Sequence, residues 1–185
     1  MHKLRAVLAG KPVLEHVLDA VRASGLPWHL EDAGHPGMGD SIAAAVRATP
    51  DANGWLVLPG DLPLMQSATL CLLADALVGA LANSPGRVAA DAMADGPAHQ
   101  QAGRAKPYQV VIPVFNGQRG HPVGFSAACR DSLLKLQGNK GAALVVNAYK
   151  AIEIIVNDIG CVTDVDTVQD LQRAQTLIDA RLPSI

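Results

Sequence analysis

The stretch Trp55-Leu56-Val57-Leu58-Pro59-Gly60-Asp61-Leu62-Pro63 joins a short apolar run to a glycine and a carboxylate. Four consecutive apolar residues bounded by turn residues predict a buried strand over 55–58. Asp61 follows at the carboxyl edge of that strand, and Gly60 leaves room beside it. A carboxylate in this position can hold Mg²⁺, which prefers hard oxygen ligands. Alternatively, Asp61 only caps a turn before Pro63, and the local pattern leaves both interpretations open.

Outward from this strand, apolar spacing predicts an alternation of helices and short strands. Predicted helices cover 12–25, a segment capped by Asp40 or Ser41, a segment opened by Ser67, 126–136, 140–149, and a last helix with a Thr167–Asp170 capping box. Predicted strands cover 28–31, 55–58, 110–114, 152–156 and 161–165. This alternation predicts an α/β fold with a Rossmann-like, mostly parallel sheet in three layers. Such sheets bind ligands at the carboxyl ends of their strands.

The composition narrows the class of protein. The chain has 185 residues, enough for one domain, and only 3% aromatics, so its core must be aliphatic. A net charge of −2 without a basic cluster argues against nucleic acid or an anionic membrane as partner. Three scattered cysteines indicate reduced thiols and a cytoplasmic protein. Residues 82–107, rich in Gly, Pro and Gln, are predicted to form a flexible excursion.

Two further carboxylates, Asp164 and Asp166, end the predicted strand over 161–165. A strand's period of two places both side chains on one face. Asp166 or Thr167 could instead serve only as the N-cap of the last helix. If Asp61 and Asp166 meet at the sheet edge, they form a magnesium site that would polarise an α-phosphate and hold the departing pyrophosphate.

Two loops carry other candidate residues. Gly37-Met38-Gly39-Asp40-Ser41 leads into a helix N-terminus, where free N–H groups suit an anion or a base edge, although a short glycine loop is a weak signal. Arg119-Gly120-His121-Pro122 combines a cation, a hinge and an imidazole. This second loop either orients a substrate or presents solvated side chains only.

Together these segments resemble the MobA-like NTP transferases, in particular the molybdenum cofactor cytidylyltransferase branch. The matching segments follow the family order over nearly the whole chain: Gly10-Lys11-Pro12-Val13-Leu14-Glu15-His16, Gly37-Met38-Gly39-Asp40-Ser41-Ile42, Gly60-Asp61-Leu62-Pro63-Leu64, Arg119-Gly120-His121-Pro122-Val123, and Asp164-Val165-Asp166-Thr167 with Asp170-Leu171.

The resemblance implies a three-layer fold of the nucleotide-diphospho-sugar transferase type. It also implies transfer of a nucleoside monophosphate, CMP from CTP, to a phosphorylated acceptor such as molybdopterin, with release of pyrophosphate. Mg²⁺ would be the cofactor, and a molybdoenzyme or its chaperone a protein partner. The rivals are GTP or a sugar phosphate as substrate, or a catalytically dead module that binds a nucleotide or a partner.

The resemblance also assigns roles to residues. Asp61 would bind magnesium, with Asp166 as the best second ligand and Asp164 close behind. Arg119 or His121 would orient the acceptor. The nucleotide would be bound by Gly37, Met38, Gly39, Ser41, Gly60 and Asp61.

The N-terminus departs from the family pattern. Lys3 aligns with a family lysine that contacts the phosphates, and it completes the expected catalytic set. Family members place a strand and a Leu-Ala-Ala-Gly-x-x-x-Arg loop before that lysine, whereas only Met1 and His2 precede it here. We therefore expect 1–185 to be a single transferase domain without this strand and loop, and a functional protein that starts upstream. Loss of the loop's positioned amides is expected to remove most of the catalysis.

Overall fold

The structure is a computed structural model that describes residues 3–82 and 108–181. The excursion predicted over 82–107 lies outside the described residues, apart from Ala82, which ends a helix. The α-helices are α1 (Val13–Ser24), α2 (Met38–Ala48), α3 (Ser67–Ala82), α4 (Arg130–Leu134), α5 (Ala143–Ala148) and α6 (Val168–Arg181). The strands are β1 (Val7–Leu8), β2 (Lys11–Pro12), β3 (Gly54–Val57), β4 (Val110–Phe115), β5 (Gln118–Arg119), β6 (Val123–Ser126) and β7 (Ala151–Ile155). The 3₁₀ turns are η1 (Lys3–Arg5), η2 (Ala127–Cys129), η3 (Gly138–Lys140) and η4 (Ile159–Val162).

The central sheet has five strands in the order β3-β6-β4-β5, with β7 paired to β4. The α/β class is confirmed, but the expectation of mostly parallel pairing is wrong. Among the described strands of this sheet, only the β4–β7 pair is parallel. The reason is β6, which runs antiparallel between β3 and β4. Strands β3, β4 and β7 nevertheless all point the same way, so their carboxyl ends share one edge.

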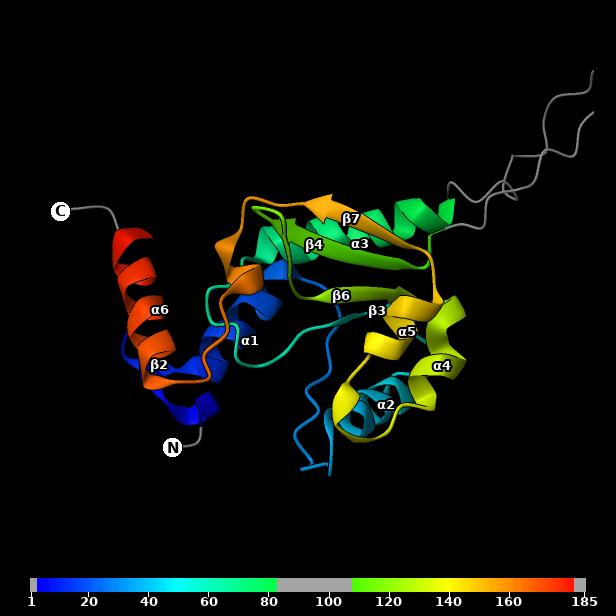
Figure 1. The fold of residues 1–185 in the computed structure, drawn as a ribbon, viewed down its shortest axis with the longest axis horizontal. Coiled ribbons are helices and arrows are strands. Elements are labelled where there is room, and N and C mark those ends of the chain that lie inside the picture. Colours follow the sequence, from blue (N-terminus) through cyan, green and yellow to red (C-terminus); the bar gives the residue numbers. More distant parts are fainter. Residues whose placement is uncertain (1–2, 83–107, 182–185) are drawn as a thin grey trace, which may run out of the picture.

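Helices cover both faces of the sheet, which confirms the three layers (Figure 1). Alternate residues of β4 point to opposite faces, because side chains in a strand alternate. Val110 and Ile112 join the core under α2, α4 and α5, whereas Val111 packs against Leu73 and Leu77 of α3. A strand buried on both faces explains the continuous apolar run that marks β4 in the sequence.

A smaller core lies where the N-terminal hairpin meets the C-terminal helix (Figure 1). Strands β1 and β2 pair through a turn at Ala9 and Gly10, both with positive φ. Leu8 of this hairpin packs with Leu64, Val165 and Ala174. The hairpin β1–β2 and helix α6 are therefore held beside the segments that carry Asp61 and Asp166.

The predicted capping box at the start of α6 is present. The backbone N–H of Asp170 donates to Oγ1 of Thr167 at 3.1 Å, and the backbone N–H of Thr167 donates to Oδ2 of Asp170 at 2.8 Å. These reciprocal bonds satisfy donors that the first helical turn leaves unpaired.

Two predicted strands are wrong, and one helix start is displaced. Residues 161–165 form the end of η4 and an irregular segment, because Asp158 and Thr163 bond the local backbone and compete with a strand ladder. Residues 28–31 are irregular as well. Helix α2 begins at Met38, so Gly37 occupies the N-cap position predicted for Asp40 or Ser41. The helices predicted over 126–136 and 140–149 are shorter, α4 and α5 with flanking 3₁₀ turns.

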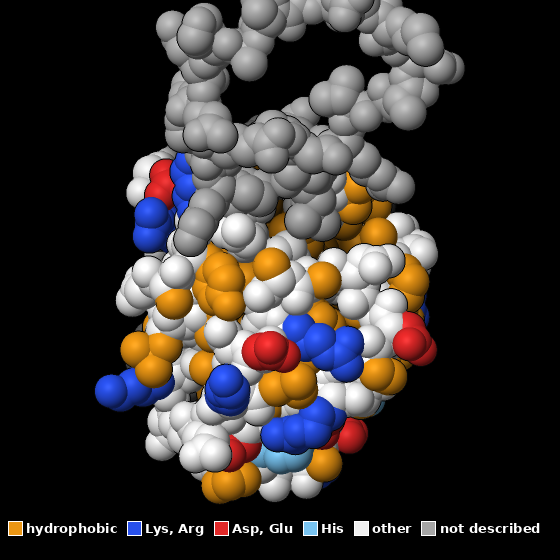
Figure 2. Space-filling model, turned by 90° about the vertical axis from the view of Figure 1, so that its right-hand side faces the viewer, with side chains coloured by type: hydrophobic (Ala, Val, Ile, Leu, Met, Phe, Trp, Pro, Cys, Tyr) orange, Lys and Arg blue, Asp and Glu red, His pale blue; other side chains and the backbone are white. Residues whose placement is uncertain are grey.

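Charged and apolar side chains are interspersed on the face of the molecule shown in Figure 2. On the face shown in Figure 2, Lys and Arg side chains lie scattered among acidic, apolar and other residues. No helix among the described residues is long and apolar enough to cross a membrane.

Candidate active site

Three segments that are distant in sequence meet at the carboxyl edge of the sheet. The backbone N–H of Val165 donates to the carbonyl oxygen of Asp61 at 2.9 Å, and that of His121 donates to the carbonyl of Cys161 at 2.8 Å. Gly120 allows the second contact, because a Cβ there would lie 2.2 Å from the Cys161 oxygen. The segments carrying Asp61, His121 and Asp166 are thus fixed to one another through their backbones.

The centre of this edge is an ion cluster of one lysine and two carboxylates. Nζ of Lys3 donates to Oδ2 of Asp61 at 2.6 Å and to Oδ1 of Asp166 at 2.5 Å. Because both oxygens contact one nitrogen, a single cation bridges the two carboxylates. Two oxygens that ligate one Mg²⁺ lie at most about 4.2 Å apart. The structure therefore brings together Lys3, Asp61 and Asp166, as expected of a shared site.

The three side chains differ in exposure and in protonation. Asp61 is 16% exposed, whereas Lys3 and Asp166 are 42% and 57% exposed. Desolvation by burial lowers the pKa of Lys3, but its hydrogen bonds to Asp166 and Asp61 and their charges outweigh that effect and raise the pKa to about 12. The lysine is therefore a permanent cation near neutral pH.

The carboxylates of Asp61 and Asp166 suit a Mg²⁺ ion that is also bound by the phosphates of a nucleotide. Among the described residues, no group of three or more His, Cys, Asp or Glu side chains is arranged to hold a metal ion by itself. Two carboxylates already share one cation here, in the position where a divalent ion would bind both. Mg²⁺ normally takes one or two carboxylates together with phosphate oxygens and water. Asp61 and Asp166 would supply the protein's part of such a shell.

His121 and Asp164 lie at the margin of the ion cluster. Desolvation lowers the pKa of the His121 imidazole, against the opposing charges of Asp61 and Asp164. The His121 side chain is exposed at the surface. Because its pKa is lowered, the imidazole is neutral near pH 7 and can accept or donate a hydrogen bond. Asp164 is exposed and follows Thr163 on the same irregular segment as Asp166.

Gly60 couples the cluster to the N-terminal segment. A Cβ at Gly60 would lie 3.1 Å from Cδ1 of Leu14 and 3.6 Å from Cδ2 of Leu4. Leu4 adjoins Lys3, so this contact places the lysine backbone beside the loop of Asp61. The role at the nucleotide that the family resemblance assigns to Gly60 stays a prediction.

Asp158 belongs to the scaffold of the site and was missed by the sequence reasoning. Its carboxylate is 2% exposed and accepts hydrogen bonds from the backbone and side chain of Gln66, from Oγ1 of Thr69 and from the backbone of Gly160. It ties the segment after Asp61 to the segment before Asp166. Asn157-Asp158 is a turn signal in the sequence, but partners 89 and 92 residues away leave no local pattern.

Arg119 is not brought into the ion cluster. Its Nε and Nη2 approach Oε1 of Glu153 at 2.7 and 2.6 Å, and both side chains are about half exposed or more. The guanidinium therefore has a carboxylate partner on β7. Its expected role at the acceptor stays a prediction.

The segment Gly37–Ser41 forms the N-terminus of α2 and packs against the turn at residues 137–141. A Cβ at Gly37 would lie 2.4 Å from the Gly138 carbonyl carbon, and the Asp40 carboxylate accepts from the Gly138 N–H at 2.8 Å. Met38 is 58% exposed. The described contacts of this segment are with that turn, so its expected role at the nucleotide base stays a prediction.

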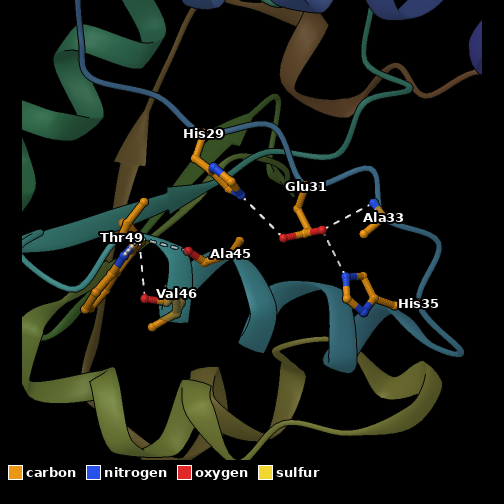
Figure 3. A network of polar contacts seen from close by, with 8 residues as sticks. His29, Glu31, Ala33, His35, Ala45, Val46 and Thr49 are labelled. Carbon is orange, nitrogen blue, oxygen red and sulfur yellow. Dashed lines mark hydrogen bonds and ion pairs between the residues drawn. The ribbon is translucent and has the colours of Figure 1, made fainter.

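The loop that leads into α2 is held by Glu31 (Figure 3). The Glu31 carboxylate contacts Nε2 of His29 at 3.4 Å and Nε2 of His35 at 3.0 Å, and it accepts from the Ala33 N–H at 3.3 Å. Hydrogen bonds from His35 and His29 lower the pKa of Glu31, so the carboxylate stays charged. This network orders the approach to Gly37 without a strand.

The sequence pattern of the MobA-like NTP transferase domain matches residues 7–152. No curated protein matches the chain.

Solved structures share the fold at low identity. Rv0371c of Mycobacterium tuberculosis H37Rv in complex with manganese is 20% identical, with a TM-score of 0.66 over 95% of this chain and 92% of that one. Molybdopterin-guanine dinucleotide biosynthesis protein A of Archaeoglobus fulgidus is 17% identical, with a TM-score of 0.62 over 97% and 92%. The 2-C-methyl-D-erythritol 4-phosphate cytidylyltransferase of Thermus thermophilus is 16% identical, with a TM-score of 0.62 over 96% and 94%. These likenesses concern the fold.

Proposed function

The chain belongs to the MobA-like NTP transferase family and is a nucleotidyltransferase, and on that premise we propose that it transfers CMP from CTP to a molybdopterin-type phosphate acceptor. In this reaction an acceptor phosphate oxygen forms a bond to the α-phosphorus. The bond between the α-phosphorus and the bridging oxygen breaks, and pyrophosphate leaves with the electron pair.

The observation that carries the proposal is the ion cluster of Lys3, Asp61 and Asp166 at the carboxyl edge of the sheet. Asp61 and Asp166 would hold Mg²⁺, which when bound offsets the negative charge on the reacting phosphates. Lys3 would neutralise further phosphate charge, because its ammonium lies at the same edge and stays protonated. These charges would act mainly by positioning and electrostatic stabilisation.

The other expected residues have supporting roles in this proposal. His121 lies beside the ion cluster and would orient the acceptor through its neutral imidazole. Gly37 to Ser41 would meet the nucleotide base with the free N–H groups of the first turn of α2. Arg119 would first have to leave Glu153 before it could contact an acceptor.

Two similarities bear on substrates and cofactor. A cytidylyltransferase and a molybdopterin-guanine dinucleotide biosynthesis protein share the fold, which supports CTP and a molybdopterin-type acceptor as the first pair to test. Because the second protein is named for a guanine dinucleotide, GTP is the first alternative to CTP as the nucleotide substrate. A similar protein was solved with manganese, so Mn²⁺ is a suitable replacement for Mg²⁺ in assays.

The test is pyrophosphate release with CTP or GTP, Mg²⁺ and a molybdopterin-type acceptor. Asp61→Asn and Asp166→Asn should each lower the rate at least ~100-fold, because each removes charge that stabilises the transition state. Asp179→Asn is the matched control, because Asp179 lies on α6 and is bonded to Gln175. Faster release with GTP would replace CTP in the proposal. If neither nucleotide reacts and both bind, the chain is a nucleotide-binding module.

A further inference from the structure

The ammonium of Lys3 occupies the place between two carboxylates that a divalent cation needs. Each carboxylate oxygen lies 2.6 Å or less from Nζ, so a metal ion cannot bind both while the lysine stays. We propose that Lys3 determines specificity: it makes Asp61 and Asp166 select a metal–nucleotide complex over the free metal ion. This inference rests on the proposed function, because it concerns the same site.

The lysine can be displaced from the two carboxylates in two ways that differ in electrostatic energy. A free divalent ion that takes Asp61 and Asp166 leaves the Lys3 ammonium without an anionic partner and adds two positive charges beside it. A metal–nucleotide complex brings phosphate oxygens along with the metal, and these accept the ammonium. The lysine then exchanges one set of anions for another. Free metal is therefore opposed by Lys3, whereas the metal–nucleotide complex is assisted by it.

The local structure allows this exchange without rearrangement of the backbone. Lys3 is 42% exposed and Asp166 57% exposed, so the ammonium can leave through solvent. The backbone next to Lys3 is held by Leu4 against Gly60 and by the Ala6 N–H donating to the Lys3 carbonyl at 3.2 Å. A lysine side chain is flexible and its ammonium can turn toward different acceptors. The motion is therefore confined to one side chain that pivots on a fixed turn.

A purely structural ion pair is the competing explanation, and the chain contains a matched example. Lys11 pairs with Asp19, and their exposures, 40% and 51%, resemble those of Lys3 and Asp166. That pair has one carboxylate for its lysine, while a second carboxylate shares the ammonium of Lys3. Exposed single pairs contribute little to stability. Lys11→Met is therefore the control: it removes a lysine of similar exposure that does not bridge two carboxylates.

The experiment measures Mn²⁺ affinity by electron paramagnetic resonance of the free ion, first with Mn²⁺ alone. Lys3→Met should bind Mn²⁺ at least ~10-fold more tightly than the unaltered chain, because the competing cation is gone. Lys3→Arg keeps the charge and should bind Mn²⁺ as weakly as the unaltered chain. Lys11→Met should leave the affinity unchanged. Circular dichroism checks that each variant is folded, and Lys3→Gln replaces Lys3→Met if the latter is not.

The second arm adds the non-reacting analogue α,β-methylene CTP. With Mn²⁺ present, Lys3→Met should bind this analogue at least ~10-fold more weakly, because a charge that would meet the phosphates is lost. Opposite signs in the two arms support the inference. Equal or weaker binding of Mn²⁺ alone by Lys3→Met overturns it, whatever the turnover. If the unaltered chain binds Mn²⁺ but no nucleotide analogue, the proposed function fails, while tighter Mn²⁺ binding by Lys3→Met still demonstrates the competition.

Discussion

Replacement of Asp158 by alanine tests the scaffold that holds the two carboxylate-bearing segments together. The Asp158 side chain is 2% exposed and accepts hydrogen bonds from Gln66, Thr69 and Gly160. Its donors come from the start of α3 on one side and from η4 on the other. Asp158→Ala removes the acceptor and leaves these donors facing a small cavity.

The expected loss of stability follows from which donors can regain water. Gln66 is exposed, so its side-chain N–H groups find solvent at little cost. Thr69 is 6% exposed and Gly160 is buried, so their donors stay unpaired. Each buried donor left without an acceptor costs about 1–3 kcal/mol. For these two donors together, the free energy of unfolding should fall by about 2–6 kcal/mol.

Urea unfolding followed by circular dichroism measures this loss, with Asp179→Ala as the exposed control. Asp158→Asn should fall between the two, because an amide has one oxygen where the carboxylate has two acceptors. A surface change is expected to stay within about 0.5 kcal/mol of the unaltered chain. If Asp158→Ala is as stable as Asp179→Ala, the hydrogen bonds of Asp158 do not hold the two segments together.

Further predictions concern other contacts of the same region. Gly160→Ala should lower the free energy of unfolding by about 1–3 kcal/mol in the same urea assay, because its Cβ would lie 2.2 Å from the Leu64 oxygen. Thr167→Ala should cost about 0.5–2 kcal/mol through loss of the α6 capping box, with Thr176→Ala as the control inside the helix. Burial and, secondarily, the charge of Asp158 raise the pKa of Cys161 from 9.0 to about 11. A raised pKa means the folded state holds the proton more tightly, so this stabilisation is complete below pH 9.0 and is lost toward about pH 11. Between these pH values the free energy of unfolding of the unaltered chain should fall more than that of Cys161→Ser. An equal fall in both proteins would contradict the assignment of this pH dependence to Cys161.

Local signals predicted the elements whose causes are local. The apolar run before Asp61 predicted β3 to within one residue, and the Thr167–Asp170 pair predicted the start of α6 with its cap. Helix α1 ends at Ser24 and is capped by Gly25, which adopts the left-handed conformation expected of a terminating glycine. In each case the residues that cause the structure are neighbours in sequence, so their spacing is visible without a fold.

Interactions between distant residues explain what the sequence did not reveal. The segment 161–165 has strand-forming composition, yet Asp158 just before it is held by Gln66 and Thr69, 92 and 89 residues away, and the segment is irregular. Lys3 was expected at the phosphates, and its bonds to carboxylates 58 and 163 residues away have no local signature. Arg119 likewise looked available for a substrate until the fold paired it with Glu153.

The antiparallel strand β6, which the expectation of a mostly parallel sheet did not predict, explains why His121 lies at the edge of the candidate site. Strands β3 and β4 bring their carboxyl ends to that edge, as parallel strands do. Because β6 runs the opposite way, it brings its beginning there, and Val123 pairs with Val57, the last residue of β3. The residues just before β6 therefore meet those just after β3, which places His121 near Asp61 and lets its backbone bond Cys161. A parallel strand in that position would have carried the same histidine to the opposite edge. The reversal of one strand is thus what lets an Asp loop and a His loop share a site.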